Sequence, residues 1–321
     1  MDKTSIVIAT YNGSQYIIEQ LESIRTQTKH PDEVIICDDN STDTTVEMVT
    51  EYITKNKLDN WSIIKNKHNI GWQKNFLQGM KKAKGDIIFY CDQDDVWESS
   101  KIEEIVRIYN QKKSIKCLAH TYSSIDANGW KMDYTVDKKG KNTKKVKKVE
   151  VGDNRFWDNP SGCTMAIKRD LLKYVRVSGK NALIDRQFCR YATFLGGMYI
   201  YDYALIKHRF HINNTSLNID KASCVLGSAT QLDRNDTLFN DLKDLINFRT
   251  LCLDEKVKKK TDLVINLMLA RWKYIHDYNC IIAVLFNSMT LYTLKPIIGD
   301  LCYKYNINSI VGHMYKMLRI R

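Results

Sequence analysis

IIFYCDQDD, residues 87–95, is an apolar run typical of a buried strand, followed directly by the tetrad Asp92-Gln93-Asp94-Asp95. Three carboxylates within four residues repel one another, so folding alone gives little reason to place them together. A hard divalent cation, Mg²⁺ or Mn²⁺, would remove that repulsion, because it takes oxygen ligands and often shares them with substrate phosphates. The alternative is a turn in which the Asp side chains accept hydrogen bonds from nearby backbone NH groups.

Strand and helix signals alternate along the first 110 residues around this stretch. Apolar residues at helical spacing fill the intervals between four short runs that predict strands: residues 5–9, 33–37, 61–64 and 87–91. This alternation predicts an α/β fold with right-handed crossovers and a Rossmann-like, mostly parallel central sheet flanked by helices. In such sheets, ligands bind at the carboxyl ends of the strands.

Polar residues follow the first two of these strands at that edge. The first strand ends in Thr10-Tyr11-Asn12, and the second in DDNSTD, residues 38–43. Tyr11 can stack against a base, and the Asp39 carboxylate can accept a hydrogen bond from the imide NH of uracil or thymine. Residues 41–43 are better suited to capping the helix that follows, because hydroxyls and a carboxylate favour a helix start.

The alternation weakens after about residue 115. Residues 117–125, 164–167 and 196–201 still predict strands, and the sequence beyond residue 235 is helical in pattern. The apolar run 280–286 is far shorter than the ~20 residues of a membrane-spanning helix. An apolar stripe between residues 307 and 318 lies beside basic residues, so it could rest in a membrane interface or pack against the protein core.

The formal charge of the chain is +12, and half of it lies in residues 131–148, where eight lysines face two aspartates. Such a run predicts a solvated, flexible loop, or else a contact with an anionic surface or an acidic acceptor. No nucleic-acid-binding motif accompanies the charge, so we exclude nucleic acid as a partner. The nine cysteines contain no CxxC pair, and the amino terminus lacks a signal-peptide pattern, so we expect a cytoplasmic protein.

Four motifs occur in a fixed order: SIVIATYN (5–12), ICDDNSTD (36–43), NIG (69–71), and GD (85–86) leading to DQDDVW (92–97). In these motifs the chain resembles the family 2 glycosyltransferases, inverting enzymes with a GT-A fold. The resemblance is specific over residues 3–110, thinner over 155–216, and absent from the lysine-rich segment and beyond about residue 220. Its DQDDxW subgroup resembles bacterial rhamnosyl- and galactosyltransferases of surface polysaccharide synthesis.

The resemblance implies a domain organisation for the chain and a donor for the sugar. It implies a glycosyltransferase domain at 1–220, with a nucleotide-sugar half (1–110) and an acceptor half (111–220), followed by a helical region at 221–321. The donor is a nucleotide-diphosphate sugar, with UDP or dTDP favoured by Asp39. The implied donor-binding residues are Thr10, Tyr11, Asn12, Asp38, Asp39, Lys74 and Asp92 for the nucleotide, and Gln93 and Asp95 for the sugar. Asp92, Asp94 and His211 are the implied ligands of Mg²⁺ or Mn²⁺, with Asp94 preferred as a direct ligand.

Inverting transfer also needs a general base, and the resemblance assigns it to Asp185. The family motif has His and Trp beside this carboxylate, whereas this chain has Ile184 and Arg186. The alternative for Asp185 is a surface ion pair with Arg186 or Arg190. The implied acceptor or diphosphate contacts are Trp97, Ser161, Gly162 and Arg209, the last in HRFHINN (208–214), which resembles a Tyr-Arg-x-His-x-x-Asn segment.

The implied acceptor is a glycan or a lipid-linked oligosaccharide that serves as a cell-surface glycan precursor, with peripheral contact at the inner face of the membrane. The sequence leaves two alternative functions. A sugar-phosphate nucleotidyltransferase should carry a Gly-rich, basic loop after the first strand, and residues 10–15 contain no basic residue. A non-catalytic partner that binds a nucleotide sugar would not need both the tetrad and a base.

Overall fold

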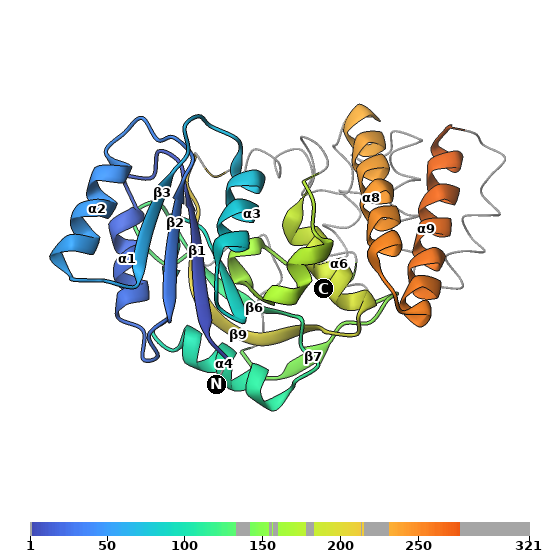
Figure 1. Ribbon diagram of the computed structural model, residues 1–321, viewed down its shortest axis with the longest axis horizontal. Helices are drawn as coiled ribbons and strands as arrows, with labels where there is room; N and C mark the ends of the chain where they lie inside the picture. The colour runs from blue at the N-terminus through green and yellow to red at the C-terminus, as the bar shows by residue number, and fades with distance from the viewer. Residues whose placement is uncertain are drawn as a thin grey trace. The chain divides into compact units, whose positions relative to one another are not determined.

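The computed structural model of the protein describes residues 2–132, 142–153, 156, 160–177, 183–212, 214 and 231–276. The chain forms two compact units (Figure 1). The first comprises residues 1–149, 159–177 and 183–210, and the second comprises residues 150–158, 178–182 and 211–321. All strands with assigned pairing belong to one nine-stranded sheet in the first unit.

Four parallel strands form the first half of this sheet, in the order β3-β2-β1-β4. They are β1 (Thr4–Thr10), β2 (Glu33–Asp38), β3 (Trp61–Lys65) and β4 (Ile87–Cys91). Ile8 pairs with Ile36 on one side and with Cys91 on the other, so β1 is central and buried on both faces. A strand buried on both faces reads as a continuous apolar run, which is why these four could be predicted.

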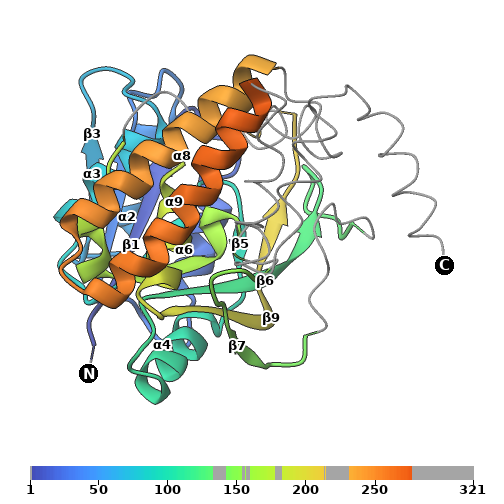
Figure 2. The same cartoon turned by 90° about the vertical axis from the view of Figure 1, so that its right-hand side faces the viewer.

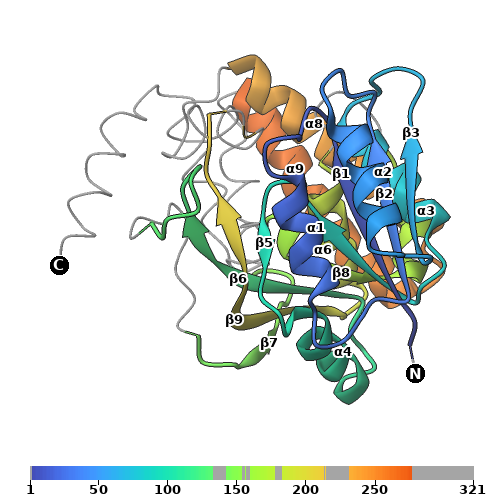
Figure 3. The same cartoon turned by 90° about the vertical axis from the view of Figure 1, so that its left-hand side faces the viewer.

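Helices cover both faces of the parallel strands. They are α1 (Ile17–Arg25), α2 (Thr45–Lys55), α3 (Trp72–Lys82) and, further along the chain, α4 (Lys101–Gln111). α1 and α2 lie on one face and α3 on the other (Figures 1 and 3). Leu21 of α1 packs among Ile6 and Ile8 of β1, whereas Gly79 of α3 faces Val7, the residue between them. This split follows from the alternation of side chains along a strand.

Gly79 lets α3 pack closely on the sheet. A Cβ atom at this position would lie 2.5 Å from the Cys37 sulfur and 2.7 Å from Cγ1 of Val7. We therefore expect Gly79→Ala to destabilise the protein by about 1–3 kcal/mol through overpacking, more than the ~1 kcal/mol that alanine gains in helix propensity. Urea unfolding measures this, with Gln78→Ala on the exposed side of the same helix as the control. Equal or greater stability of Gly79→Ala would show that the helix can move away at little cost.

The second half of the sheet is mixed, with the order β4-β8-β6-β9-β5. Its strands are β5 (Val96–Trp97), β6 (Cys117–Ile125), β7 (Val146–Lys148), β8 (Met165–Lys168) and β9 (Met198–Arg209). β8 is antiparallel to both β4 and β6, β9 is parallel to β6, and β5 and β7 pair antiparallel with β9. The α/β prediction is confirmed, with parallel pairing confined to the first four strands and to β6–β9.

The lysine-rich segment does not fit the prediction of a flexible loop throughout. Its end, Val146–Lys148, is strand β7, because the backbone of this stretch finds a partner in Tyr199–Tyr201 of β9. Residues 133–141 of the segment lie outside the described part of the chain. Two lysines on each side of Val146 therefore did not exclude an edge strand.

Short helical segments complete the first unit, and a helical pair dominates the described part of the second. The former are η1 (Gly162–Thr164), η2 (Arg169–Tyr174) and α6 (Ile184–Phe194). In the second unit, α8 (Gln231–Leu251) and α9 (Glu255–His276) lie side by side (Figure 2) and share an ion pair between Arg249 and Asp262. The helical pattern predicted beyond residue 235 is confirmed for these two helices.

The stretches predicted to face a membrane, 280–286 and 307–318, fall outside the described residues. Within the part of the chain that is described, no helix has both the length and the apolar character needed to cross a bilayer.

Candidate active site

The loops that follow β1, β2 and β4 are joined by side-chain hydrogen bonds at the carboxyl edge of the sheet. The Gln93 amide bonds twice to Tyr11: the Tyr11 NH donates to Oε1 at 2.9 Å, and Nε2 donates to the Tyr11 carbonyl at 3.2 Å. The Asn12 NH donates to Oγ of Ser41, and the Thr42 NH donates to Oδ1 of Asn12, both at 2.9 Å. The three polar tips predicted to meet are therefore brought together, and Gln93 serves as a clamp rather than projecting freely toward a donor sugar.

Asp38 and Thr10 are scaffold residues within this arrangement. The buried Asp38 carboxylate accepts hydrogen bonds from the Thr10 hydroxyl at 3.0 Å and from the Ser41 NH at 2.8 Å, and the Ser41 hydroxyl also donates to it. Thr10 is itself buried. Their polar atoms bond to each other and to the loop, and their contact with the nucleotide stays a prediction. Ser41 is likewise a loop linker and not the helix cap that we predicted.

Asp39 organises the segment that leads into α3. Its carboxylate accepts hydrogen bonds from Nδ2 of Asn66 and from the NH groups of Ile70 and Gly71, all at 2.9 Å. An ionised carboxylate has about four acceptor positions, so these three bonds leave one for a further donor. Tyr11, at the rim of the same edge, is 46% exposed. Lys74, on the first turns of α3, is exposed as well.

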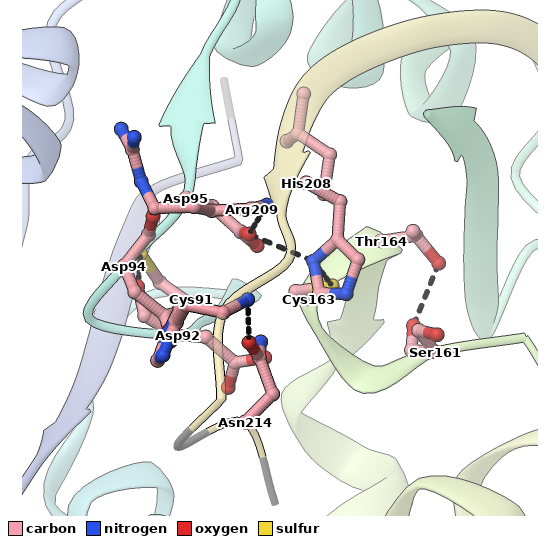
Figure 4. A network of polar contacts seen from close by, with 12 residues as sticks. Cys91, Asp92, Asp94, Asp95, Ser161, Cys163, Thr164, His208, Arg209 and Asn214 are labelled. Carbon is pink, nitrogen blue, oxygen red and sulfur yellow. Dashed lines mark hydrogen bonds and ion pairs between the residues drawn. The ribbon is translucent and has the colours of Figure 1, made fainter. Parts of the chain in front are cut away.

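The acidic tetrad carries the electrostatic strain that its sequence predicts. Burial, together with the nearby carboxylates of Asp95 and Asp94, raises the pKa of Asp92 well above its ordinary value. A divalent cation would relieve this repulsion, and the oxygen donors of Asp92 and Asp94 are the type that Mg²⁺ and Mn²⁺ prefer. The residues present therefore fit a hard divalent metal. Figure 4 shows the three aspartates of the tetrad and the polar contacts around them.

Asp95 points into the protein. It is 1% exposed, and its Oδ1 accepts hydrogen bonds from Nδ1 of His208 at 2.7 Å and from the Arg209 NH at 3.1 Å (Figure 4). Burial alone would lower the pKa of His208, but the Asp95 carboxylate, with Asp92 and Asp94 nearby, raises it to about 9. The predicted contact between Asp95 and the sugar is not supported, because this carboxylate is committed to a buried ion pair.

Arg209 is an anchor for the tetrad. Its Nε donates to the backbone carbonyl of Asp94 at 2.9 Å, and a terminal nitrogen donates to Glu19 of α1 at 2.5 Å. The guanidinium also lies over the Tyr16 ring, 4.7 Å from its centroid. The donors of Arg209 are directed at protein groups, and its role in diphosphate binding stays a prediction.

Asp185 lies in the first turn of α6, and its charge acts on the tetrad. Burial raises the pKa of Asp185, and its negative charge contributes to raising the pKa values of both Tyr90 and Asp92. Its carboxylate accepts a hydrogen bond from the adjacent Arg186 NH at 2.7 Å. The nearby charge of Arg186 acts in the opposite direction and favours the ionised carboxylate.

Two of the predicted acceptor-side residues frame Tyr90, and a third is in the core. A Cβ atom on Gly162 would lie 2.7 Å from the Tyr90 ring, and the Ser161 carbonyl beside it accepts two hydrogen bonds from Thr164. Trp97 is 3% exposed, tilts against Phe89 and has the Lys101 ammonium 3.7 Å from its ring centroid. The prediction that Trp97 contacts an acceptor is therefore not supported, since its indole is enclosed by the core.

His211 begins the described part of the second unit that follows β9. There its NH donates to the Asn214 side chain at 2.5 Å. Because the tetrad belongs to the first unit, the role of His211 as a metal ligand stays a prediction.

Three residues that support the tetrad were not predicted from the sequence. His208 and Cys163 contact Asp95, and Glu19 pairs with Arg209. One signal was present: His208 stands where the related motif has Tyr, and a histidine directly before Arg209 is a possible partner for an acid. Glu19 carried no signal, because it lies 190 residues from Arg209 in the sequence and looks like any exposed helical glutamate.

Comparisons with known proteins identify the family and the fold. The family model described as "Glycosyl transferase family 2" matches residues 5–189. An uncharacterized glycosyltransferase of Nostoc sp. is 24% identical over 282 residues, which cover 85% of this chain and 82% of that protein. The Escherichia coli glucosyltransferase WfaP, whose name gives UDP-Glc as donor and GlcNAc-diphosphoundecaprenol as acceptor, is 34% identical over 128 residues, 39% of this chain and 49% of WfaP.

A similar fold is found among solved structures. Residues 1–349 of Staphylococcus aureus TarS, crystallised with UDP-GlcNAc, superpose with a TM-score of 0.62 at 19% sequence identity. The superposition covers 85% of this chain and 72% of that one. A likeness at this identity shows a shared fold.

Proposed function

This chain belongs to the family 2 glycosyltransferases, with a GT-A fold, and from that membership we propose that it is a metal-dependent inverting enzyme that transfers a sugar from a nucleotide-diphosphate donor to a hydroxyl of a cell-surface glycan precursor. One observation carries the proposal: a carboxylate with a raised pKa, Asp185, lies within electrostatic reach of an acidic tetrad at the carboxyl edge of the sheet. The pair supplies the two functions that the reaction requires, a base and a site for a charged leaving group.

The nucleotide would be held by Tyr11, which is 46% exposed, and by Asp39, which is 2% exposed. The exposed Tyr11 ring offers a stacking surface for the base. Asp39 is fixed by its three hydrogen bonds and retains one acceptor position, which suits the imide NH of uracil or thymine. The UDP in the name of WfaP and the UDP-GlcNAc in the TarS crystal support a uridine donor.

The diphosphate would be held at Asp92 and Asp94 through Mg²⁺ or Mn²⁺. When bound, the metal offsets the negative charge that builds up on the departing nucleoside diphosphate. The contribution of this chain is to hold both carboxylates in place before the donor binds. Arg209 does this through the Asp94 carbonyl, and Gln93 through its two bonds to Tyr11.

Asp185 would remove the proton from the acceptor hydroxyl as that oxygen attacks the anomeric carbon. The bond from the anomeric carbon to the diphosphate oxygen breaks on the opposite face, so the configuration inverts. A carboxylate whose pKa is raised by burial is a stronger base than an exposed one, which brings it nearer to the pH at which it works. Ser161 and Gly162 would border the acceptor on the side of Tyr90.

The acceptor class follows from the same comparison. The name of WfaP gives a sugar attached to diphosphoundecaprenol as its acceptor, and its similarity covers 39% of this chain. We therefore propose a lipid-linked oligosaccharide, reached by a cytoplasmic enzyme at the inner face of the membrane. We also propose that the transferase domain spans residues 1–220, and that the helical region at 221–321 is an addition to it.

Calorimetric titration with UDP, dTDP, GDP and CMP, in Mn²⁺ and again in EDTA, tests the donor and metal assignments. We expect UDP or dTDP to bind most tightly and this binding to be lost in EDTA. Metal-independent binding, or no preference among the nucleotides, would contradict the assignment of Asp92, Asp94 and Asp39. Release of pyrophosphate from a nucleoside triphosphate and a sugar phosphate would instead indicate a nucleotidyltransferase.

A further inference from the structure

Three potential metal ligands meet behind the tetrad. Asp95 follows β4, Cys163 lies in η1 and His208 lies near the end of β9, so three separate segments supply them. Their ligand atoms all lie within 4.8 Å of one another, and all three residues are buried (Figure 4). The cluster is distinct in composition from the tetrad, because it offers one oxygen, one sulfur and one nitrogen donor.

The three side chains contact one another directly. Nδ1 of His208 lies 2.7 Å from Oδ1 of Asp95 and 3.8 Å from the sulfur of Cys163, a cysteine that is in no disulfide. The second carboxylate oxygen of Asp95 is buried and receives no hydrogen bond from a nitrogen or oxygen donor among the described residues, and the Cys163 thiol hydrogen-bonds to this carboxylate. A thiol is a weak donor, so a cation between the three side chains would satisfy the buried carboxylate better.

We propose that Asp95, Cys163 and His208 form a second metal site, selective for Zn²⁺ and separate from the Mg²⁺ or Mn²⁺ position at Asp92 and Asp94. Thiolate, imidazole and carboxylate are the ligands that Zn²⁺ takes in proteins, whereas Mg²⁺ takes oxygen ligands and keeps water. Three protein ligands leave one of the four tetrahedral positions of Zn²⁺ for a water molecule or the second Asp95 oxygen.

Zn²⁺ takes cysteine as a thiolate and histidine as a neutral imidazole, so its binding releases protons to solvent. Lys101 lies beside the cluster, and its Nζ donates to the backbone carbonyl of Cys163 at 3.1 Å.

Zinc at this position would tie the tetrad loop to η1 and β9 in the same unit. We therefore expect Zn²⁺ to raise the thermal unfolding temperature, because a ligand that binds only the folded chain stabilises it.

The experiment uses the full-length protein, stripped with EDTA and dialysed, in a large excess of Mg²⁺ that fills the oxygen-ligand site. Zn²⁺ is titrated in competition with a chromophoric chelator. We expect one Zn²⁺ per chain, and Cys163→Ser should weaken its binding at least ~100-fold, since loss of a supporting residue alone costs 10–100-fold. Cys189→Ser, at another buried free cysteine outside the cluster, is the matched control and should bind as the wild type does. With Co²⁺ as the probe, a sulfur-to-metal charge-transfer band should appear in the wild type and be absent from Cys163→Ser.

The proposal is overturned if no stoichiometric Zn²⁺ binds, or if Cys163→Ser binds Zn²⁺ as well as the wild type. It is also overturned if Asp92→Asn abolishes Zn²⁺ binding while Cys163→Ser does not, because the ion would then occupy the tetrad. His208→Gln is a second variant that retains a donor to Asp95, and it should fold and lose Zn²⁺ binding. These outcomes are independent of whether the chain transfers a sugar.

Discussion

Asp185→Asn should lower kcat about 10²- to 10⁴-fold, the range that a positioned general base contributes. The amide cannot accept the proton of the acceptor hydroxyl, yet it matches the carboxylate in size. Its oxygen can still accept the hydrogen bond from the Arg186 NH. The affinity for the donor nucleotide should therefore be unchanged, and the loss should appear in kcat.

The stability of this variant should not fall, which separates a catalytic role from a structural one. The pKa of Asp185 is raised in the folded protein, so its ionised form is disfavoured there relative to the unfolded chain. The corresponding stability is present below the unfolded pKa and is lost as the pH rises through the folded pKa. At neutral pH the neutral amide removes that penalty, so we expect an unchanged or higher unfolding temperature.

The same shift predicts the acid side of the pH profile. Because the base must be ionised, activity should decline as the pH falls through a pKa that lies above the 3.8 of an ordinary aspartate. Steady-state kinetics with the donor identified by calorimetry and a lipid-linked acceptor measure both effects. Asp170→Asn, at an exposed carboxylate of the same unit, is the control and should retain full turnover. Normal turnover in Asp185→Asn would place the base elsewhere, and a joint loss of folding and binding would make the residue structural.

Asp94→Ala should reduce transfer on the order of 10³-fold, since a metal that stabilises a leaving group contributes several kcal/mol and each 1.36 kcal/mol is tenfold in rate. Metal-dependent binding of the nucleoside diphosphate should be lost in the same variant. The contact of Asp94 with Arg209 is made by its backbone carbonyl, which alanine retains, so the anchor of the tetrad should survive.

Calorimetry with Mn²⁺ and the preferred diphosphate, followed by kinetics, measures the effect of Asp94→Ala. Asp59→Asn, an exposed aspartate before β3, should behave as the wild type does and controls for a general loss of charge. If Asp94→Ala still bound the diphosphate in an EDTA-sensitive manner, the metal would be held by other ligands. If it unfolded at a much lower temperature, the tetrad would be a structural turn.

The α/β fold could be predicted from the sequence because short apolar runs alternate with apolar residues at helical spacing. The strands of the parallel half are buried on both faces, so each appears as a short apolar run, and residues 87–91 coincide with β4. The tetrad could be recognised because like charges in sequence neighbours are close in any fold, whatever the partners are. β5 and β7 could not be predicted, since strands of two and three residues carry too little pattern and depend on pairing with β9.

The sequence alone thus determined where the strands of the parallel half lie along the chain, the acidic tetrad and the family. It also gave Asp185 as the candidate base. The tertiary structure decided which polar residues of the motifs are available to a ligand. Asp38, Asp95 and Arg209 have the residue types of binding groups, but their partners make them scaffold, and Glu19 reaches Arg209 across 190 residues of sequence. The physical reason is that a side chain's charge is local information, whereas its burial and its hydrogen-bond partners are set by contacts between segments far apart in the chain.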